Sequence, residues 1–125
     1  MSDHPFVHIE IPAENPLAAG KFYQQLFHWK TEDVPQYDYV TFDADKGLGG
    51  GFPRIDGQTY KPNDVIVYIG TDDIDTTLQR IEALGGKTLL PKSEIPGIGW
   101  YAFFSDPTGN RLALFTGNPM PGGAA

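Results

Sequence analysis

The chain of 125 residues has the length of a single domain, and its 40% of hydrophobic residues can bury a real core. The absence of cysteine excludes disulfides, thiolate metal sites and a cysteine nucleophile, so a reducing cytoplasm is the expected location. A formal charge of −7 makes nucleic acid and anionic membranes poor partners. No secretory signal is expected at the start, and the apolar runs are too short for a membrane span.

The first predicted strand begins at Val7, and its side chains alternate in character. Val7, Ile9 and Ile11 face one way and should pack on a helix, whereas His8 and Glu10 face the other. His8 and Glu10 should lie about 7 Å apart on that face. Imidazole and carboxylate groups ligate divalent ions and transfer protons. An ordinary polar pair or a mutual ion pair is the alternative interpretation.

A helix is predicted to begin at Asn15-Pro16, because asparagine is a favoured N-cap and proline a favoured first helical residue. Its predicted end is Phe27-His28, where the imidazole interacts with the helix dipole in a structural role. The predicted apolar face has helical spacing and consists of Ala19, Phe22, Tyr23 and Leu26.

Three strands are predicted after this helix, near residues 29–34, 38–42 and 48–52. Tyr39 lies in the second of them. The glycine-rich run around Gly50 and Gly51 lacks the lysine and the following helix of a phosphate-binding loop. Such glycines mark a close backbone approach, a bulge or a floor kept open for a ligand, and we favour the last two.

The pattern then repeats in a second copy. Here Val65, Val67 and Ile69 take the apolar side of the strand, and Ile66 and Tyr68 take the other. The matching helix should follow the N-cap Asp73 and end at the glycine pair 85–86. Its predicted apolar face consists of Ile74, Leu78, Ile81 and Leu84.

Three further strands are predicted near residues 88–90, 100–105 and 111–116, with a turn at 106–109 between the last two. The middle strand has two aromatic faces, one with Trp100 and Phe104 and the other with Tyr101 and Phe103. One face should line a ligand cleft, and the sequence leaves open which. Arg111 is a candidate anchor for an anion, or else a solvated arginine at a sheet edge.

The predicted fold class is α+β, with two tandem βαβββ modules. A helix followed by three consecutive strands argues against a doubly wound parallel sheet. One domain is expected over residues 1–125. It should comprise module one (5–54), a linker (55–63), module two (64–117) and a flexible tail (118–125). Each sheet then has one face without a helix, and covering these faces with each other or with a partner chain creates a concave cleft.

These motifs together resemble the vicinal oxygen chelate superfamily, which includes glyoxalase I, bleomycin-resistance proteins and extradiol dioxygenases. The residues that carry the resemblance lie at 6–12, 19–29, 85–86 and 95–110. The resemblance spans residues 5–117 and implies paired modules that form a cup-shaped mixed sheet. It also implies a homodimer.

Metal-dependent members of this superfamily hold a divalent ion with one ligand from the first and last strand of each module. The matching positions here are His8, Gly50 or Gly51, Ile66 and Ala113, so one of the four ligands is retained. A catalytic metal needs about three protein ligands. We therefore expect no cofactor, although His8 with Glu10 could still hold a divalent ion.

The leading functional prediction is a protein that binds a small molecule in an aromatic cup, without a full catalytic metal site. The residues predicted to line the site are His8, Glu10, Tyr39, Tyr68, Trp100 and Arg111. The alternative is a lyase or isomerase acting on a small carbonyl compound, with His8 or Glu10 as general base and with or without a divalent metal. A third reading is a module whose cleft binds another protein.

Overall fold

The structure is a computed structural model that describes residues 3–44 and 46–118. It contains, in chain order, β1 (Phe6–Glu10), α1 (Pro16–Phe27), β2 (Lys30–Val34), the short 3-10 helix η1 (Pro35–Tyr37), β3 (Tyr39–Asp43), β4 (Gly49–Pro53), β5 (Ile66–Gly70), α2 (Ile74–Ala83), β6 (Lys87–Ile95), β7 (Gly99–Ser105) and β8 (Arg111–Gly117). This order confirms the predicted α+β class and the repeated βαβββ pattern. Among the described residues, no helix is long and apolar enough to cross a membrane.

The chain divides into two compact units. Residues His8–Val67 form the first unit, and the described residues before His8 and after Val67 form the second. The boundaries fall inside β1 and β5, so each unit contains part of both strands. The predicted flexible tail, 118–125, lies outside the described residues except for Asn118, whose N–H donates to the carbonyl of Ile98 at 3.0 Å.

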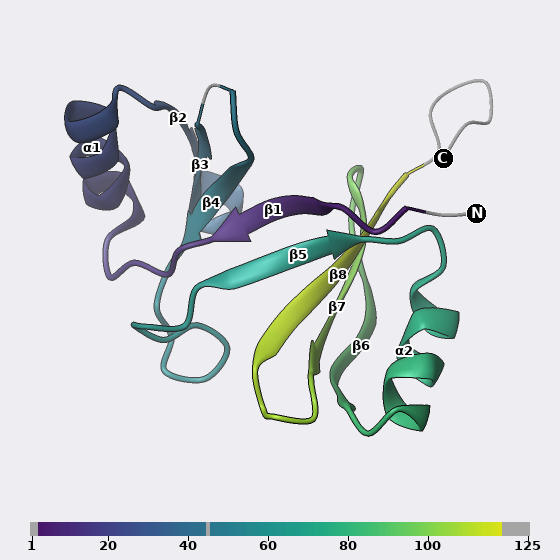
Figure 1. Cartoon of the computed structure of the whole chain (residues 1–125). Coiled ribbons are helices and arrows are strands. Elements are labelled where there is room, and N and C mark those ends of the chain that lie inside the picture. The colour runs from purple at the N-terminus through teal and green to yellow at the C-terminus, as the bar shows by residue number, and fades with distance from the viewer. Residues whose placement is uncertain (1–2, 45, 119–125) are drawn as a thin grey trace. The chain divides into compact units, whose positions relative to one another are not determined.

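In the first unit, β4 lies between β3 and β1. The β2–β3 and β3–β4 pairs are antiparallel and the β4–β1 pair is parallel. Helix α1 packs against β2, β3 and β4 (Figure 1). The core consists of Val40, Phe42 and Phe52, with Ile9, Ile11, Ala13, Ala19, Tyr23, Trp29 and Ala44 packed around them. Ile9 and Ile11 therefore face the helix side, as predicted.

Helix α1 begins as predicted, and only part of its predicted apolar face packs on the core, namely Ala19 and Tyr23. The Asn15 side chain accepts the N–H of Ala18 at 3.1 Å, which caps the helix. Phe22 and Leu26, predicted to be core, are 58% and 54% exposed, so that part of the prediction is wrong. The buried residues of α1 are Pro16 and Gly20, and a Cβ on Gly20 would lie only 3.2 Å from Val40 Cγ1, so the helix approaches β3 most closely at this glycine.

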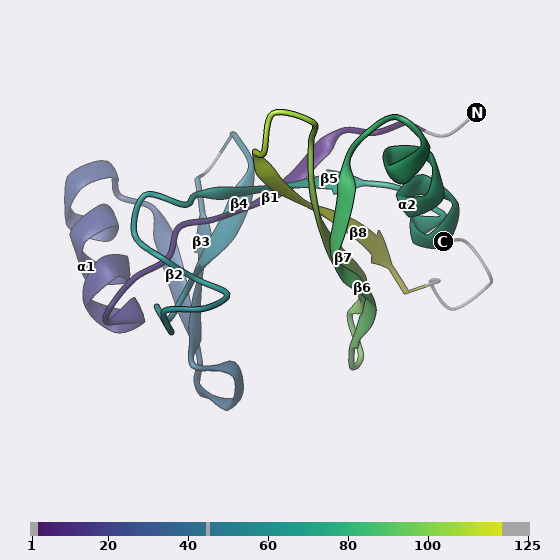
Figure 2. The ribbon, with the colours of Figure 1, turned by 90° about the horizontal axis from the view of Figure 1, so that it is seen from below.

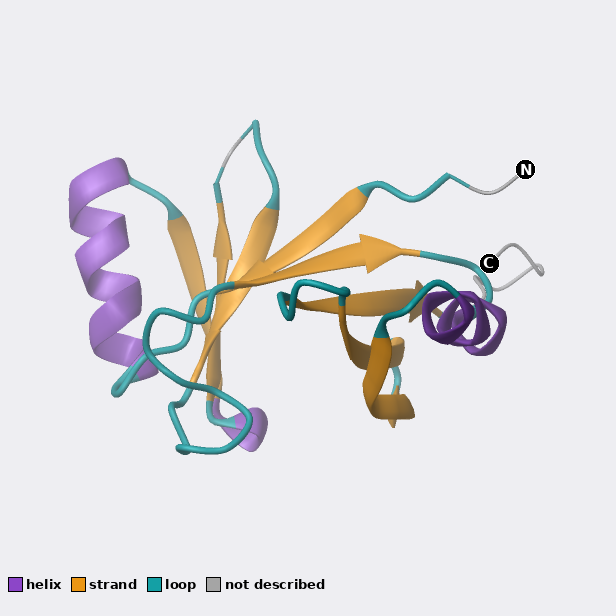
Figure 3. Ribbon diagram, turned by 60° about the horizontal axis from the view of Figure 1, so that its bottom comes forward, coloured by secondary structure: helices purple, strands orange, loops and turns teal. Residues whose placement is uncertain are grey.

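In the second unit, β8 pairs parallel with β5 and antiparallel with β7, and β7 pairs antiparallel with β6. Helix α2 packs beside these strands, as Figures 2 and 3 show. The core contains Ile74, Leu78, Ala102, Phe104 and Leu114, with Ile69, Ile81, Trp100 and Leu112 packed against it.

Three predictions for the second module need correction. Leu84 is 70% exposed, because it forms the C-cap of α2 rather than part of its buried face. Val65 precedes β5 and is 51% exposed. Strand β6 runs on to Ile95 with two register shifts, and Pro91, which has no N–H to donate, lies in the second irregular stretch.

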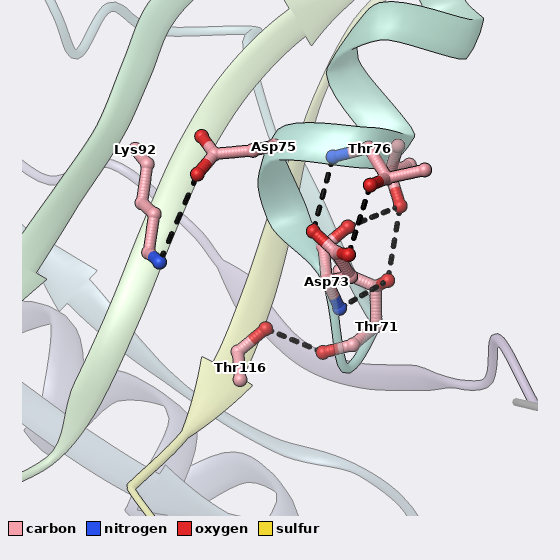
Figure 4. A network of polar contacts seen from close by, with 7 residues as sticks. Thr71, Asp73, Asp75, Thr76, Lys92 and Thr116 are labelled. Carbon is pink, nitrogen blue, oxygen red and sulfur yellow. Dashed lines mark hydrogen bonds and ion pairs between the residues drawn. The ribbon is translucent and has the colours of Figure 1, made fainter.

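A network of polar contacts holds the start of α2 (Figure 4). Asp73 caps the helix by accepting the N–H of Thr76 at 3.0 Å, and its own N–H donates to the Thr71 hydroxyl at 3.2 Å. Thr116 of β8 donates to the Thr71 carbonyl at 2.5 Å. These bonds tie the β5–α2 turn to β8. A surface cavity of about 320 Å³ adjoins the network, but Thr71, Asp73 and Thr76 already serve as helix caps and turn contacts there.

Candidate functional site

A polar cluster forms on the face of β1 that points away from α1. His8 and Glu10 lie two residues apart on this strand, and both contact the hydroxyl of Tyr39 on β3. The Tyr39 hydroxyl donates to Glu10 Oε2 at 2.9 Å, and it lies 2.7 Å from His8 Nε2. The prediction that His8 and Glu10 share one face is therefore confirmed, and Tyr39 connects them.

The direction of these hydrogen bonds follows from the number of protons. A phenol has a single proton, and Tyr39 donates it to Glu10. His8 Nε2 must then carry the proton of its own bond and donate to the phenol oxygen. The result is a chain of donors that runs from His8 through Tyr39 to Glu10.

The protonation states of His8 and Tyr39 are set mainly by burial. Burial lowers the pKa of His8, so the imidazole is neutral at pH 7. Burial, and next the negative charge of Glu10, raise the pKa of Tyr39 far above its ordinary value. Tyr39 therefore stays a phenol that donates a hydrogen bond. Glu10 is 5% exposed, which makes it a buried carboxyl group with Tyr39 as one of its donors.

The glycines of β4 fit their neighbours closely. Gly51 lies opposite Glu10 in the β1–β4 ladder, and a Cβ there would lie 2.1 Å from three atoms of the Tyr39 side chain. A Cβ at Gly50 would lie 1.8 Å from the carbonyl oxygen of Ile9. The expectation of a bulge or a floor kept open for a ligand is wrong at these two positions. One accommodates the Tyr39 ring and the other a close backbone approach.

The residues present do not fit the divalent metal that the resemblance implies. Gly51 has no side chain, and the space above it is filled by Tyr39. Ile66 and Ala113 at the third and fourth positions are fully buried apolar residues. Within residues 3–44 and 46–118, no three His, Asp or Glu side chains lie close enough together to hold a metal ion. His8 with Glu10 is short of the three protein ligands that a catalytic site uses.

A second cluster, of aromatic side chains, lies in the second unit. Tyr68 on β5 and Phe103 on β7 both pair with Ala113 of β8, so they share one face of the sheet. The Phe103 ring packs edge-on against Tyr68 at 6.3 Å and against Tyr101 at 5.6 Å. The Arg111 guanidinium lies 5.0 Å from the Phe103 ring. Tyr68 and Phe103 are 5% and 3% exposed, so this cluster is largely packed inside the unit. We call Tyr68, Tyr101, Phe103 and Arg111 the aromatic cluster.

Trp100 lies on the other face of β7 and does not belong to the aromatic cluster. It packs against the core cluster around Ile74 and Leu78, on the helix side of the sheet. The Lys92 ammonium lies over the Trp100 ring, with Nζ 4.8 Å from the ring centre. Successive side chains of β7 point to opposite faces of the sheet, so Trp100 and Tyr101 lie on different faces. The face that contains Tyr101 and Phe103 is the one that also contains Tyr68.

The loop before Tyr60 was not predicted to take part in the site. The Asp56 carboxylate accepts the N–H groups of Gln58, Thr59 and Tyr60 at 2.8–2.9 Å, and these bonds lower its pKa. The Tyr60 side chain lies near enough to Tyr39 to contribute to its raised pKa. An aspartate followed by glycine is the sequence signal for such a turn, but nothing in the sequence directs Tyr60 towards Tyr39.

Comparison with known proteins decides the family. A model described as a glyoxalase-like domain matches residues 8–115. The chain belongs to this glyoxalase-like family. A glyoxylase-like domain-containing protein of Didymella fabae is 32% identical over 86% of this chain and 90% of its own length.

Other relatives of this glyoxalase-like domain are longer. The anthracycline biosynthesis protein DnrV of Streptomyces peucetius is 31% identical over 90% of this chain, which spans about half (47%) of that protein. Among solved structures, a glyoxalase/bleomycin resistance protein/dioxygenase superfamily member from Vibrio splendidus has a TM-score of 0.65 at 15% identity. That match covers 91% of this chain and 99% of the other. This match confirms the predicted fold, and the glyoxalase-like domain model confirms the family.

Proposed function

We propose that this glyoxalase-like domain binds a small aromatic molecule that carries hydrogen-bond donors, without a catalytic metal. The observation that carries the proposal is the hydrogen-bonded chain of His8, Tyr39 and Glu10. Burying an imidazole and a carboxyl group costs free energy that a purely structural strand would avoid. Groups with shifted pKa values that cluster on one sheet face are typical of binding and catalytic sites.

The chemistry of the cluster indicates which ligands suit it. Glu10 accepts hydrogen bonds, and its negative charge when ionised attracts amines and repels carboxylates and phosphates. Neutral His8 adds no positive charge to attract an anion. The net charge of −7 also favours a neutral or cationic ligand over an anionic one.

A relative's name is consistent with an aromatic ligand. The Streptomyces peucetius protein is named for anthracycline biosynthesis, and anthracyclines are polycyclic aromatic compounds. This chain spans about half of that protein, so the comparison supports the class of ligand and not its identity. The cup in which the resemblance would place the ligand stays a prediction.

A matched set of aromatic probes tests the proposal. Naphthylmethylamine and naphthol should raise the melting temperature of the protein, whereas naphthoate should not, because its carboxylate meets Glu10. We expect Glu10→Gln to weaken binding of the amine about tenfold, the usual value of a hydrogen bond to a charged group. Exposed Glu14→Gln is the control and should leave the affinity unchanged. Naphthoate binding as tightly as the amine would count against the proposal.

The alternative function is a lyase or isomerase acting on a small carbonyl compound. One observation favours it: the chain of donors connects a half-buried imidazole to a buried carboxyl group through a phenol. Such an arrangement can hold a proton and pass it between Glu10 and His8. Glu10 would take the proton from the carbon beside the carbonyl, and Tyr39 would keep the carboxylate in position.

Deuterium exchange distinguishes the two functions. Hydroxyacetone is incubated in D₂O with protein that has been treated with a chelator, and loss of the proton signal is followed by NMR. If the domain is such an enzyme, exchange is catalysed and falls about a hundredfold or more in Glu10→Gln. No exchange above the protein-free rate would count against the enzyme and leave the binding proposal standing.

We also propose a homodimer in the cytoplasm, as expected from the resemblance and from the lack of cysteine. Helix α1 offers apolar area of the kind that a dimer buries, because four of its large apolar side chains are more than half exposed: Leu17, Phe22, Leu26 and Phe27. Light scattering coupled to gel filtration measures the mass directly. A monomer at micromolar concentration would contradict the proposal.

A further inference from the structure

Tyr39 and Gly51 compete for one volume in the first unit. The register pairs Gly51 with Thr41 on β3 and with Glu10 on β1, so position 51 lies beside the carboxyl group of the polar cluster. The Tyr39 ring crosses above Gly51 on its way to His8 and Glu10. An ideal Cβ on Gly51 would lie 2.1 Å from Cε1, Cζ and Oη of Tyr39, far inside contact distance.

We propose that Gly51 is a positioning residue whose missing side chain allows the Tyr39 phenol to join His8 to Glu10. Any larger residue at position 51 displaces the phenol and breaks both of its hydrogen bonds. The pair therefore puts a proton-donating phenol where the resemblance would place a ligand for a metal ion. This proposal depends on the geometry of the first unit and not on the proposed ligand.

The neighbouring Gly50 shows why the assignment is specific to Gly51. A Cβ on Gly50 would meet the Ile9 carbonyl oxygen at 1.8 Å, and that oxygen belongs to the backbone of β1. A clash with backbone persists whatever side chain stands at position 39. The three atoms nearest to a Cβ on Gly51 all belong to the Tyr39 side chain, so we expect that removing the ring relieves this clash.

A double-mutant cycle tests this difference. Gly51→Ala alone should lower the melting temperature by about 5–15 °C, the usual effect of overpacking in a domain of this size. In a Tyr39→Ala background the same substitution should cost nothing, because the ring is gone. In a Tyr39→Phe background it should cost less than in the wild type but more than in Tyr39→Ala, since Phe keeps the ring but has no hydroxyl whose hydrogen bonds can be broken. A Gly51→Ala penalty that persists in the Tyr39→Ala background would overturn the proposal.

Two further glycine variants are matched controls. Gly50→Ala should be as destabilising in the Tyr39→Ala background as in the wild type, or fail to fold in both. Gly47→Ala should leave the melting temperature unchanged, because among the described residues its Cβ would meet only the Ala44 carbonyl oxygen, at 3.9 Å, an ordinary contact.

The ¹⁵N chemical shifts of the His8 ring report on its hydrogen bond to Tyr39. A substitution that only lowered stability would leave them unchanged in the folded protein. In ¹⁵N-labelled wild-type protein, His8 Nε2 should carry the proton and show a hydrogen-bonded shift. In folded Gly51→Ala, measured well below its melting temperature, we expect the His8 spectrum of Tyr39→Phe instead. A His8 spectrum identical to that of the wild type would show that the phenol stays in place, and the proposal would fail.

Discussion

Tyr39 is the residue that turns two side chains on one strand into a connected cluster. Its hydroxyl contacts both His8 and Glu10, which lie 31 and 29 residues away in the sequence. Because its pKa is raised far above the ordinary value, the phenol keeps its proton at neutral pH. The cluster therefore presents a neutral imidazole, a neutral phenol and a buried carboxyl group.

The lowered pKa of His8 gives the first prediction, a loss of stability in mild acid. Burial holds this pKa below its ordinary value of 6.5, so at intermediate pH the unfolded chain binds more protons at His8 than the folded chain. Stability should then fall as the pH drops below 6.5, until the folded protein is protonated too. Thermal melts from pH 7.5 to pH 5 should show this decline, and the slope should be smaller in His8→Gln.

His28→Asn is the control for that experiment, because His28 is exposed and ends α1 in a left-handed conformation that asparagine also adopts. Its pH slope should match the wild type. The carboxyl groups of Asp56, Asp73 and Asp106 have lowered pKa values and lose their stabilising effect only below their ordinary value of 3.8, so they act in a separate range. An unchanged slope in His8→Gln would contradict the assignment.

At the scale of elements, caps were easier to predict than buried faces. Asn15 and Asp73 both cap the helices that the sequence predicted to begin there. These caps were predictable because N-capping depends on residues that are close together in the chain. The buried side of α1 depends on how closely the helix approaches β3, which Gly20 determines. Local spacing alone could not distinguish Tyr23, which packs on the core, from Phe22, which does not.

The second prediction concerns the cap of α1. Replacing Asn15 with alanine removes the acceptor of the Ala18 N–H and should destabilise the protein by about 1 kcal/mol. Asn15→Ser keeps an acceptor and should cost only a few tenths of that amount. Urea denaturation measures both, and equal losses for the two variants would contradict the capping role.

For the whole molecule, each compact unit contains one tryptophan in its core. Trp29 packs in the first unit and Trp100 in the second. Because the unit boundaries cut through β1 and β5, unfolding of either unit disrupts strands that the other needs. We predict one cooperative transition, with the same urea midpoint in Trp29→Phe and Trp100→Phe when fluorescence follows the remaining tryptophan. Each substitution can change the overall free energy of unfolding by itself. If the two midpoints differ by more than this change explains, the prediction of one cooperative transition is wrong.

The fourth prediction, also for the whole molecule, concerns metal. Since His8 and Glu10 fall short of three ligands and Tyr39 fills the space above Gly51, a chelator should leave the melting temperature unchanged. Calorimetric titration with Zn²⁺ or Co²⁺ should show no stoichiometric site. Binding at one ion per chain that disappears in His8→Ala would contradict this expectation.

The sequence by itself determined the repeat, the helix caps, the alternation that places His8 and Glu10 on one face, and the family. These features are local or repeated, so short-range spacing records them. Only the tertiary structure decided that Tyr39 bridges His8 and Glu10, that Gly51 makes room for it, and that Tyr101 rather than Trp100 accompanies Tyr68. Those outcomes depend on the register of strands that are distant in the chain, which no local pattern specifies.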